Sequence, residues 1–189
     1  MTVSTSSPPS TAQSVWQIDP THSAVEFSVR HMMISTVKGR FTGIQGTIVD
    51  VAENPALSSV EVAIDPASIS TADDKRDAHL RSPDFFDTAT YPTITFKSTR
   101  VVGTREEFKV TGDLTVRDQT RPVTLDVTFN GTGISPFGQR IASFSASTQL
   151  NRKDFGLNWN VALETGGVLV SDKFKLEIEI EAVQQDAAS

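Results

Sequence analysis

Cysteine is absent from the 189 residues, and the chain has one tyrosine and two tryptophans beside eleven phenylalanines. Without a thiol there is no disulfide, thiolate nucleophile, cysteine-rich zinc site or cysteine-ligated iron–sulfur cluster. No run of residues approaches the roughly 18 apolar residues of a membrane helix, so no integral membrane segment is predicted. The net charge of −6 and the pI near 5.0 exclude nucleic acid as the expected partner, because a phosphate backbone would be repelled.

Leucine is also scarce, with nine residues against 52 threonines, valines and isoleucines taken together. β-Branched side chains are stiff in helices and pack well on a pleated surface, which favours an all-β fold. Apolar and polar residues alternate with period two in eight segments, each of which predicts a strand with one apolar face. These segments are 25–30, 44–49, 60–65, 94–97, 108–117, 123–129, 143–150 and 174–181. Short connections predict antiparallel pairing, in either a sandwich or a closed barrel.

One segment departs from this alternation and predicts a short helix at about residues 72–80. Thr71 and Asp74 have the spacing of a capping box, and Pro83 ends the helix. Asn130-Gly131 predicts a hairpin turn directly after a strand. The segments 103–106 and 118–122 are short enough for two more hairpins.

The two ends of the chain differ in composition from the rest. Ten of residues 1–14 are Ser, Thr or Pro and none is charged, which predicts a disordered tail. The polar segment 184–189 is expected to fray, so the predicted folded domain is 15–183. Because the start of the chain lacks the basic and apolar parts of a secretory signal, a cytoplasmic location is expected.

A polar cluster in the predicted helix is the strongest candidate for a binding site. Arg76, His79 and Arg81 either form ion pairs on an exposed helix or hold an anionic head group at the mouth of a cavity. The three histidines, at positions 22, 31 and 79, have no zinc-motif spacing, and neither a metal nor a cofactor is predicted. Arg152 follows a strand and is expected to pair with Asp77 or Asp154, and Gly156 supplies a positive φ for the turn.

The ordered series of motifs resembles the YceI family of bacterial polyisoprenoid-binding, lipocalin-like proteins. The matching stretches are WQIDPTHSAVEFSVRHMMISTVKGRF, RDAHLRSPDFFDTATYPTITFKS, VTGDLTVRDQTRPVTLDV, NRKDFGLNW and GVLVSDKFKLEIEIE. The resemblance implies an extended eight-stranded antiparallel barrel around an apolar tunnel, with one short helix near its mouth. It also implies a long amphiphilic ligand, such as an isoprenoid, an isoprenoid quinone or a fatty-acid derivative, and a homodimer.

This resemblance, together with the strand pattern, gives three sets of expected site residues. The ligand tunnel is expected to be lined by Phe27, Val29, Phe96, Phe108, Leu125, Val127, Phe129, Phe144 and Phe174. The ligand head group is expected at His22, Arg30, His31, Arg76, His79, Arg81 and Arg152. Structural roles are expected for the motif residues Asp77, Asn151, Asp154 and Phe155.

Two other functions are compatible with the same residues. An enzyme on this fold, such as a lyase or isomerase, would use His79 and Asp77 as an acid–base pair. A barrel with a filled interior would act through its surface instead. A non-catalytic protein that carries or stores a lipid in its tunnel is the preferred interpretation.

Overall fold

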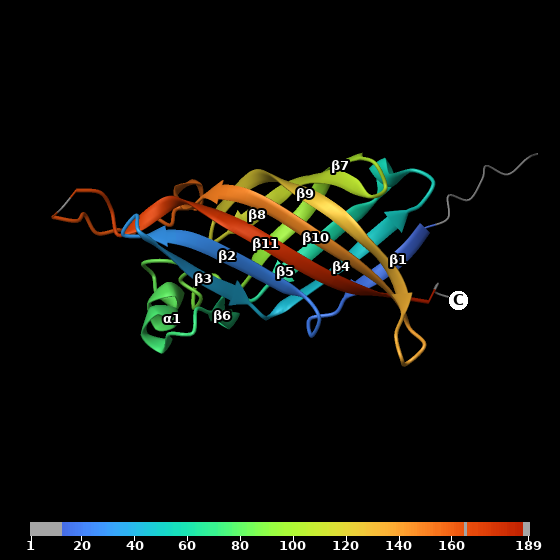
Figure 1. The fold of residues 1–189 in the computed structure, drawn as a ribbon, viewed down its shortest axis with the longest axis horizontal. Coiled ribbons are helices and arrows are strands. Elements are labelled where there is room, and N and C mark those ends of the chain that lie inside the picture. The colour runs from blue at the N-terminus through green and yellow to red at the C-terminus, as the bar shows by residue number, and fades with distance from the viewer. Residues whose placement is uncertain (1–12, 165, 187–189) are drawn as a thin grey trace, which may run out of the picture.

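The computed structural model describes residues 13–164 and 166–186 (Figure 1). These residues form one antiparallel sheet and one α-helix, with three short 3₁₀ helices in the connections. The strands are β1 (Gln13–Ile18), β2 (Ala24–His31), β3 (Ser35–Phe41), β4 (Ile44–Val51), β5 (Ser59–Ile64), β6 (Ile69–Ser70), β7 (Ile94–Gly103), β8 (Glu107–Val116), β9 (Gln119–Ile134), β10 (Arg140–Asn151) and β11 (Val170–Gln184). The helices are η1 (Pro55–Leu57), η2 (Pro66–Ser68), α1 (Asp74–Arg81) and η3 (Arg152–Phe155).

The sheet closes into a barrel, because β1 pairs with β4 on one side and with β11 on the other. The closed ring runs β1-β4-β5-β7-β8-β9-β10-β11 and returns to β1. Beyond a turn at residues 19–23, β2 continues along β11, and β3 and β6 extend the sheet from β2. The eight-stranded antiparallel barrel is therefore confirmed, and the sandwich is excluded. Alternation alone did not separate the two, since both give each strand one apolar face.

The eight predicted segments lie in β2, β4, β5 and β7–β11, whereas β1, β3 and β6 were not predicted. β3 was not predicted because Gly39 interrupts the series of apolar side chains on its inward face. A Cβ at Gly39 would lie 2.4 Å from Cζ of Phe27, so the Phe27 ring on β2 fills the space that a β3 side chain would occupy. The strands run slightly past the predicted domain boundaries of 15 and 183, because β1 begins at Gln13 and β11 ends at Gln184. The rest of the two predicted disordered ends, 1–12 and 187–189, lies outside the described residues.

Of the three predicted hairpins, one was wrong and two are present. Asn130-Gly131 forms no hairpin turn but a bulge within β9, where Ser143 pairs with Gly131 and Phe144 pairs with Phe129. Gly131 has φ +128°, which suits glycine, and the bulge lets β9 continue to Ile134 before the chain turns. The hairpin predicted at 103–106 is present between β7 and β8. The hairpin predicted at 118–122 is shorter, because β9 already begins at Gln119.

Helix α1 begins two residues later than predicted, and Thr71 is not its cap. Asp73 is the N-cap, since its carboxylate accepts a hydrogen bond from the Arg76 amide at 3.0 Å. This bond lowers the pKa of Asp73. Ser82 follows the last helical residue, immediately before Pro83, as the sequence predicted. No helix among the described residues is both long enough and apolar enough to cross a membrane.

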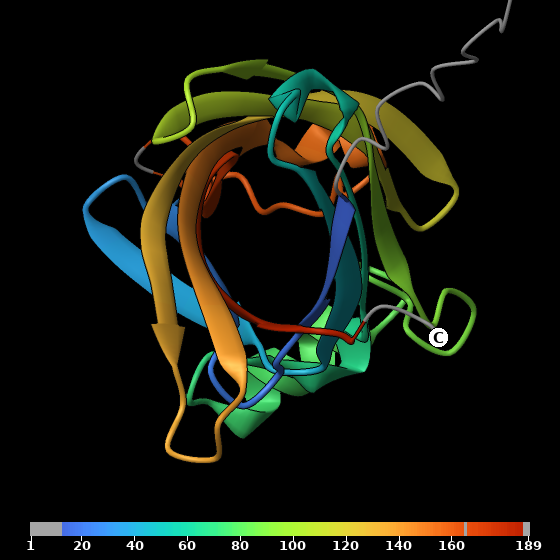
Figure 2. The same ribbon diagram turned by 90° about the vertical axis from the view of Figure 1, so that its right-hand side faces the viewer.

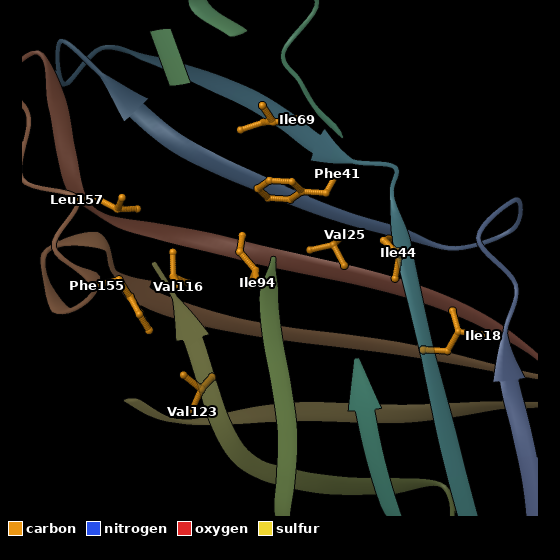
Figure 3. Packing of buried hydrophobic residues seen from close by; sticks show 10 residues of the cluster. All are labelled: Ile18, Val25, Phe41, Ile44, Ile69, Ile94, Val116, Val123, Phe155 and Leu157. Carbon is orange, nitrogen blue, oxygen red and sulfur yellow. The ribbon is translucent and has the colours of Figure 1, made fainter. Parts of the chain in front are cut away.

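A packed cluster closes the end of the barrel that carries α1 (Figures 1 and 3). Ile69 is completely buried and Phe155 is 2% exposed, and the Phe41 ring meets Phe86 edge-on at 5.6 Å. Other members of this cluster, including Val25 and Val123, come from strands of the barrel wall.

Candidate ligand cavity

A cavity of about 530 Å³ occupies the half of the barrel away from α1. Figure 2 looks down the barrel from this end, where β1 begins and β11 ends. Its floor is shared with the closed-end cluster through Ile18, Val25 and Val123. Its other end is lined by exposed residues at strand ends and turns, which we call the mouth: Gln13, Ala52, Ser59, Thr104, Arg105, Thr132 and Arg140. The cavity is thus open at one end of the barrel.

The wall of the cavity follows directly from strand periodicity. Side chains two residues apart on one strand share a face, so each strand sends alternate residues inward. The wall residues taken from β9, β10 and β11 are Val123, Leu125, Val127, Phe129, Ala142, Phe144, Ala146, Leu176, Ile178 and Ile180. Their neighbours in sequence face outward and are mostly polar, such as Thr124, Asp126 and Glu177. The wall is therefore apolar because the sequence alternates.

Six of the nine predicted tunnel residues line the cavity: Phe96, Phe108, Leu125, Val127, Phe129 and Phe144. Phe27, Val29 and Phe174 do not, and this part of the prediction is corrected. Phe27 packs 5.9 Å from Phe41 in the closed-end cluster. Val29 pairs with Phe174 where β2 and β11 run past the closed end. Periodicity identifies the inward face of a strand but not how far along the barrel the cavity extends.

None of the seven predicted head-group residues lines the cavity. Arg76 and Arg81 instead attach α1 to the chain before it. Arg76 donates from Nε to the Thr71 hydroxyl at 2.7 Å and from Nη2 to the Thr71 carbonyl at 2.9 Å. Arg81 donates to the carbonyls of Ala67 and Ile69 at 2.8 and 2.9 Å. Both guanidinium groups therefore hold α1 over the closed end of the barrel.

His79 and Asp77 do not contact each other as an acid–base pair would. Nε2 of His79 lies 2.8 Å from the Asp84 carboxylate, and its ring meets Trp159 edge-on at 4.6 Å. Asp77 is buried and accepts hydrogen bonds from the Thr71 amide and hydroxyl at 2.8 and 2.6 Å. Asp77 thus fixes the chain that enters α1.

Arg152 is 4% exposed, and its donors are taken by backbone carbonyls. It donates to Ser171 at 3.0 Å, to Trp159 at 2.9 Å and to Leu157. Its carboxylate partner is Asp172 at 3.4 Å, not Asp77 or Asp154 as predicted. Burial lowers the pKa of Arg152, and the Asp172 carboxylate opposes this shift. Arg152 therefore braces two segments of chain and has no donor left for a head group.

The motif around Arg152 forms a tight turn. The Asn151 side chain accepts a hydrogen bond from the Lys153 amide at 3.0 Å and begins η3. Gly156 ends η3 with φ +73°, as the sequence predicted. Phe155 is buried in the closed-end cluster, whereas Asp154 is exposed.

The remaining predicted head-group residues lie in turns. Arg30 donates to the Met33 carbonyl at 3.0 Å in the turn between β2 and β3, and His31 is the last residue of β2. Nδ1 of His22 lies 2.8 Å from the Asp19 carboxylate and 3.6 Å from that of Glu181. The hydrogen bond with Asp19 raises the pKa of His22. Hydrogen bonds from Thr21 and His22 lower the pKa of Asp19 to about 2.

Asp19, His22 and Glu181 place one ligand atom each within 4.8 Å of one another, which is the spacing of a metal site. The His22 side chain is 64% exposed, and its ring nitrogen is already hydrogen-bonded to Asp19. The His22 ring lies between the Asp19 and Glu181 carboxylates and links the turn between β1 and β2 to β11.

Sequence reasoning missed the charged residues that do line the cavity, which are Asp50, Arg105 and Arg140. One signal for Arg140 was present. It precedes Ala142, Phe144 and Ala146 at the same spacing of two, so it begins the inward face of β10. Arg105 lies in the hairpin between β7 and β8, where periodicity carries no information.

A closed antiparallel barrel of eight strands with an apolar cavity open at one end belongs to the class of barrels that enclose a ligand. The YceI-like domain family model matches residues 16–182, so the chain belongs to the YceI-like domain family. A UPF0312 protein of Staphylococcus aureus is 39% identical over 168 residues, which cover 86% of this chain and 94% of the relative.

Two solved structures share the fold. Burkholderia cenocepacia BcnA has a TM-score of 0.76 at 23% identity and covers 87% of this chain and 98% of its own. A polyisoprenoid binding domain from Saccharophagus degradans, described as implicated in plant cell wall breakdown, has a TM-score of 0.63 at 16% identity. That alignment covers 90% of this chain and 98% of the Saccharophagus chain.

Proposed function

We propose that this protein binds a long-chain amphiphilic lipid in its cavity and carries or stores it unchanged. The ligand class is an isoprenoid, an isoprenoid quinone or a fatty-acid derivative. The observation that carries the proposal is the distribution of polarity in the cavity. The floor and wall are apolar from Ile18 to Ile180, and the charged lining residues are Asp50, Arg105 and Arg140. Such a cavity suits an apolar chain whose polar end lies at the mouth.

Burial of the chain supplies the free energy of binding. Each buried methylene contributes about 0.8 kcal/mol, so ten contribute roughly 8 kcal/mol. A micromolar dissociation constant corresponds to about 8 kcal/mol, and association costs several kcal/mol besides. A ligand of micromolar affinity or better therefore buries well over ten methylenes. Short-chain analogues are expected to bind weakly.

The likeness to the Saccharophagus domain supports the choice of ligand, because that domain is described as polyisoprenoid binding and has the same fold. The catalytic alternative loses its support, since His79 contacts Asp84 rather than Asp77 and neither His79 nor Asp77 lines the cavity. The alternative of a filled barrel is disfavoured by the cavity itself. The homodimer remains a proposal, which sedimentation velocity at binding concentrations tests.

A cavity-filling variant tests lipid binding directly. Ala146 lies on the inward face of β10, where a phenylalanine would project into the cavity. Ala146→Phe is expected to abolish binding of geranylgeraniol, measured by calorimetry, while the barrel stays folded. Gln149→Phe is the matched control, because Gln149 is exposed on the opposite face of the same strand. Absence of binding by the unmodified protein, with no lipid recovered by native mass spectrometry, would refute the proposal.

A further inference from the structure

We propose that the mouth recognises an anionic head group, a phosphate or carboxylate, on the cavity ligand through one or the other of two arginines, Arg105 and Arg140. This inference rests on the proposed lipid binding and specifies its ligand further. It moves the head group to the opposite end of the barrel from α1, where sequence reasoning had put it. The evidence is the position of each guanidinium, its partners and the charges around it.

Arg140 reaches the cavity because of its register. It pairs with Ile134 where β9 and β10 leave their hairpin, and it begins the inward series that continues with Ala142 and Phe144. Its side chain is therefore the first inward-facing group on β10 that a chain entering the mouth would pass. Among the described residues, no carboxylate lies within 4.0 Å of its guanidinium.

Arg105 is held at the mouth by its own hairpin and by an aromatic ring. The Thr104 amide donates to the Glu107 carbonyl at 2.9 Å, which closes the turn that carries Arg105. The Arg105 guanidinium lies over the Phe129 ring, 5.9 Å from its centroid. Phe129 itself lines the cavity and lies 5.3 Å from Phe144. The stacking thus holds a planar cation against the apolar wall, with its N–H edges available to a ligand.

The charged residues that line the cavity favour an anion, whereas the net charge of the whole protein does not. The lining includes two arginines and one carboxylate, Asp50, which accepts a hydrogen bond from Ser58 at 3.4 Å. Glu106 and Glu107 follow Arg105 in the hairpin but do not line the cavity. With a net charge of −6, the whole protein repels anions. An anionic ligand therefore gains from these two cations only when its head group lies at the mouth.

Three arginines elsewhere in the chain differ from Arg105 and Arg140 in the hydrogen bonds that their guanidinium groups donate. Arg76, Arg81 and Arg152 are fully engaged with hydroxyl and carbonyl oxygens of the protein. No hydrogen bond from the side chain of Arg105 or Arg140 to another described residue is present at the mouth. Guanidinium groups on a cavity lining with their donors unused are suited to bidentate recognition of phosphate or carboxylate.

The test compares two ligands that differ only in the head group, geranylgeranyl phosphate and geranylgeraniol. Calorimetry with the full chain measures both dissociation constants. We expect the unmodified protein to prefer the phosphate by about 10- to 100-fold, the scale of one charge-assisted hydrogen bond. The double variant Arg105→Gln/Arg140→Gln is expected to lose this preference and keep its affinity for the alcohol. Arg100→Gln is the matched control, because Arg100 is exposed on β7 and does not line the cavity.

The possible outcomes separate the two proposals. If the unmodified protein binds neither ligand, lipid binding itself fails. If it binds both equally, or if the double variant weakens both equally, lipid binding stands and the head-group subsite is refuted. The same calorimetry also measures the dissociation constant of inorganic phosphate alone. Affinity for it equal to that for the prenyl phosphate would mean that the mouth binds a free anion, which also refutes recognition of a lipid head group.

Discussion

Arg152 offers the sharpest test of how the closed end is held together. The side chain is 4% exposed, and replacing it with methionine keeps most of its volume while removing every donor. Arg152 also donates to the Val170 carbonyl at 3.4 Å, and this carbonyl would keep a partner, because the Asn160 side chain donates to it at 2.7 Å. The carbonyls that would lose the guanidinium are those of Leu157, Trp159 and Ser171.

The expected magnitude follows from these three acceptors. A buried polar group left without its hydrogen bond costs about 1–3 kcal/mol. Two of the three contacts are only partly buried, so water replaces part of the loss at the Trp159 and Ser171 carbonyls. Asp172 is 40% exposed and stays solvated without its partner. Arg152→Met is therefore expected to lower the free energy of unfolding by about 3–5 kcal/mol, as for other broken buried charge networks.

Equilibrium urea unfolding followed by circular dichroism measures this change. A loss of about 3–5 kcal/mol is a large part of the roughly 5–15 kcal/mol that stabilises a typical domain. Arg121→Met is the control, since Arg121 is exposed and donates only to Thr120 and Gln119 beside it. The control is expected to stay within about 0.5 kcal/mol of the unmodified protein. A change of less than about 1 kcal/mol for Arg152→Met would refute the bracing role.

Three further predictions concern other parts of the barrel. Gly112→Ala is expected to cost about 1–3 kcal/mol in urea unfolding, because its Cβ would lie 2.5 Å from a backbone oxygen of β7; an unchanged midpoint would contradict this. Thr71→Val is expected to cost about 1–3 kcal/mol in thermal unfolding, because the buried Asp77 carboxylate loses its hydroxyl donor; a stability equal to that of the unmodified protein would count against it. In an NMR titration, His22 is expected to show a pKa above its ordinary 6.5, and Asp19→Asn to bring that pKa back toward 6.5. The His22 contribution to stability is present below pH 6.5 and disappears as the pH rises through the raised pKa. The Asp19 contribution is present above pH 3.8 and disappears as the pH falls toward about 2. If the His22 pKa in the Asp19→Asn variant equals that in the unmodified protein, the pairing of His22 with Asp19 is disproved.

The wall of the cavity was largely predictable because a local rule produces it. In β9, the series Val123, Leu125, Val127 and Phe129 alternates with polar residues, and all four side chains line the cavity. The pleat of a strand fixes this division between faces without reference to any other segment. The short helix followed from equally local signals, an acidic start and the proline after its end.

The charged part of the site was not predictable in the same way. The sequence contains ten arginines, and local pattern does not distinguish Arg105 from Arg76. The Arg76 side chain donates hydrogen bonds to the Thr71 hydroxyl and carbonyl. The Arg105 guanidinium instead lies over the ring of Phe129, which is 24 residues away in the chain. Which partners a long side chain meets depends on how distant segments are brought together.

By itself, then, the sequence determined the all-β class, the inward face of most strands and the absence of thiol chemistry. Only the tertiary structure decided that the sheet closes through β1 and β11, that the α1 end is packed solid, and that the cavity opens at the other end beside Arg105 and Arg140. The physical reason is the range of the interactions. Alternation and caps act between neighbours along the chain, whereas closure, filling and the loss of water around each charge arise from contacts between strands far apart in sequence.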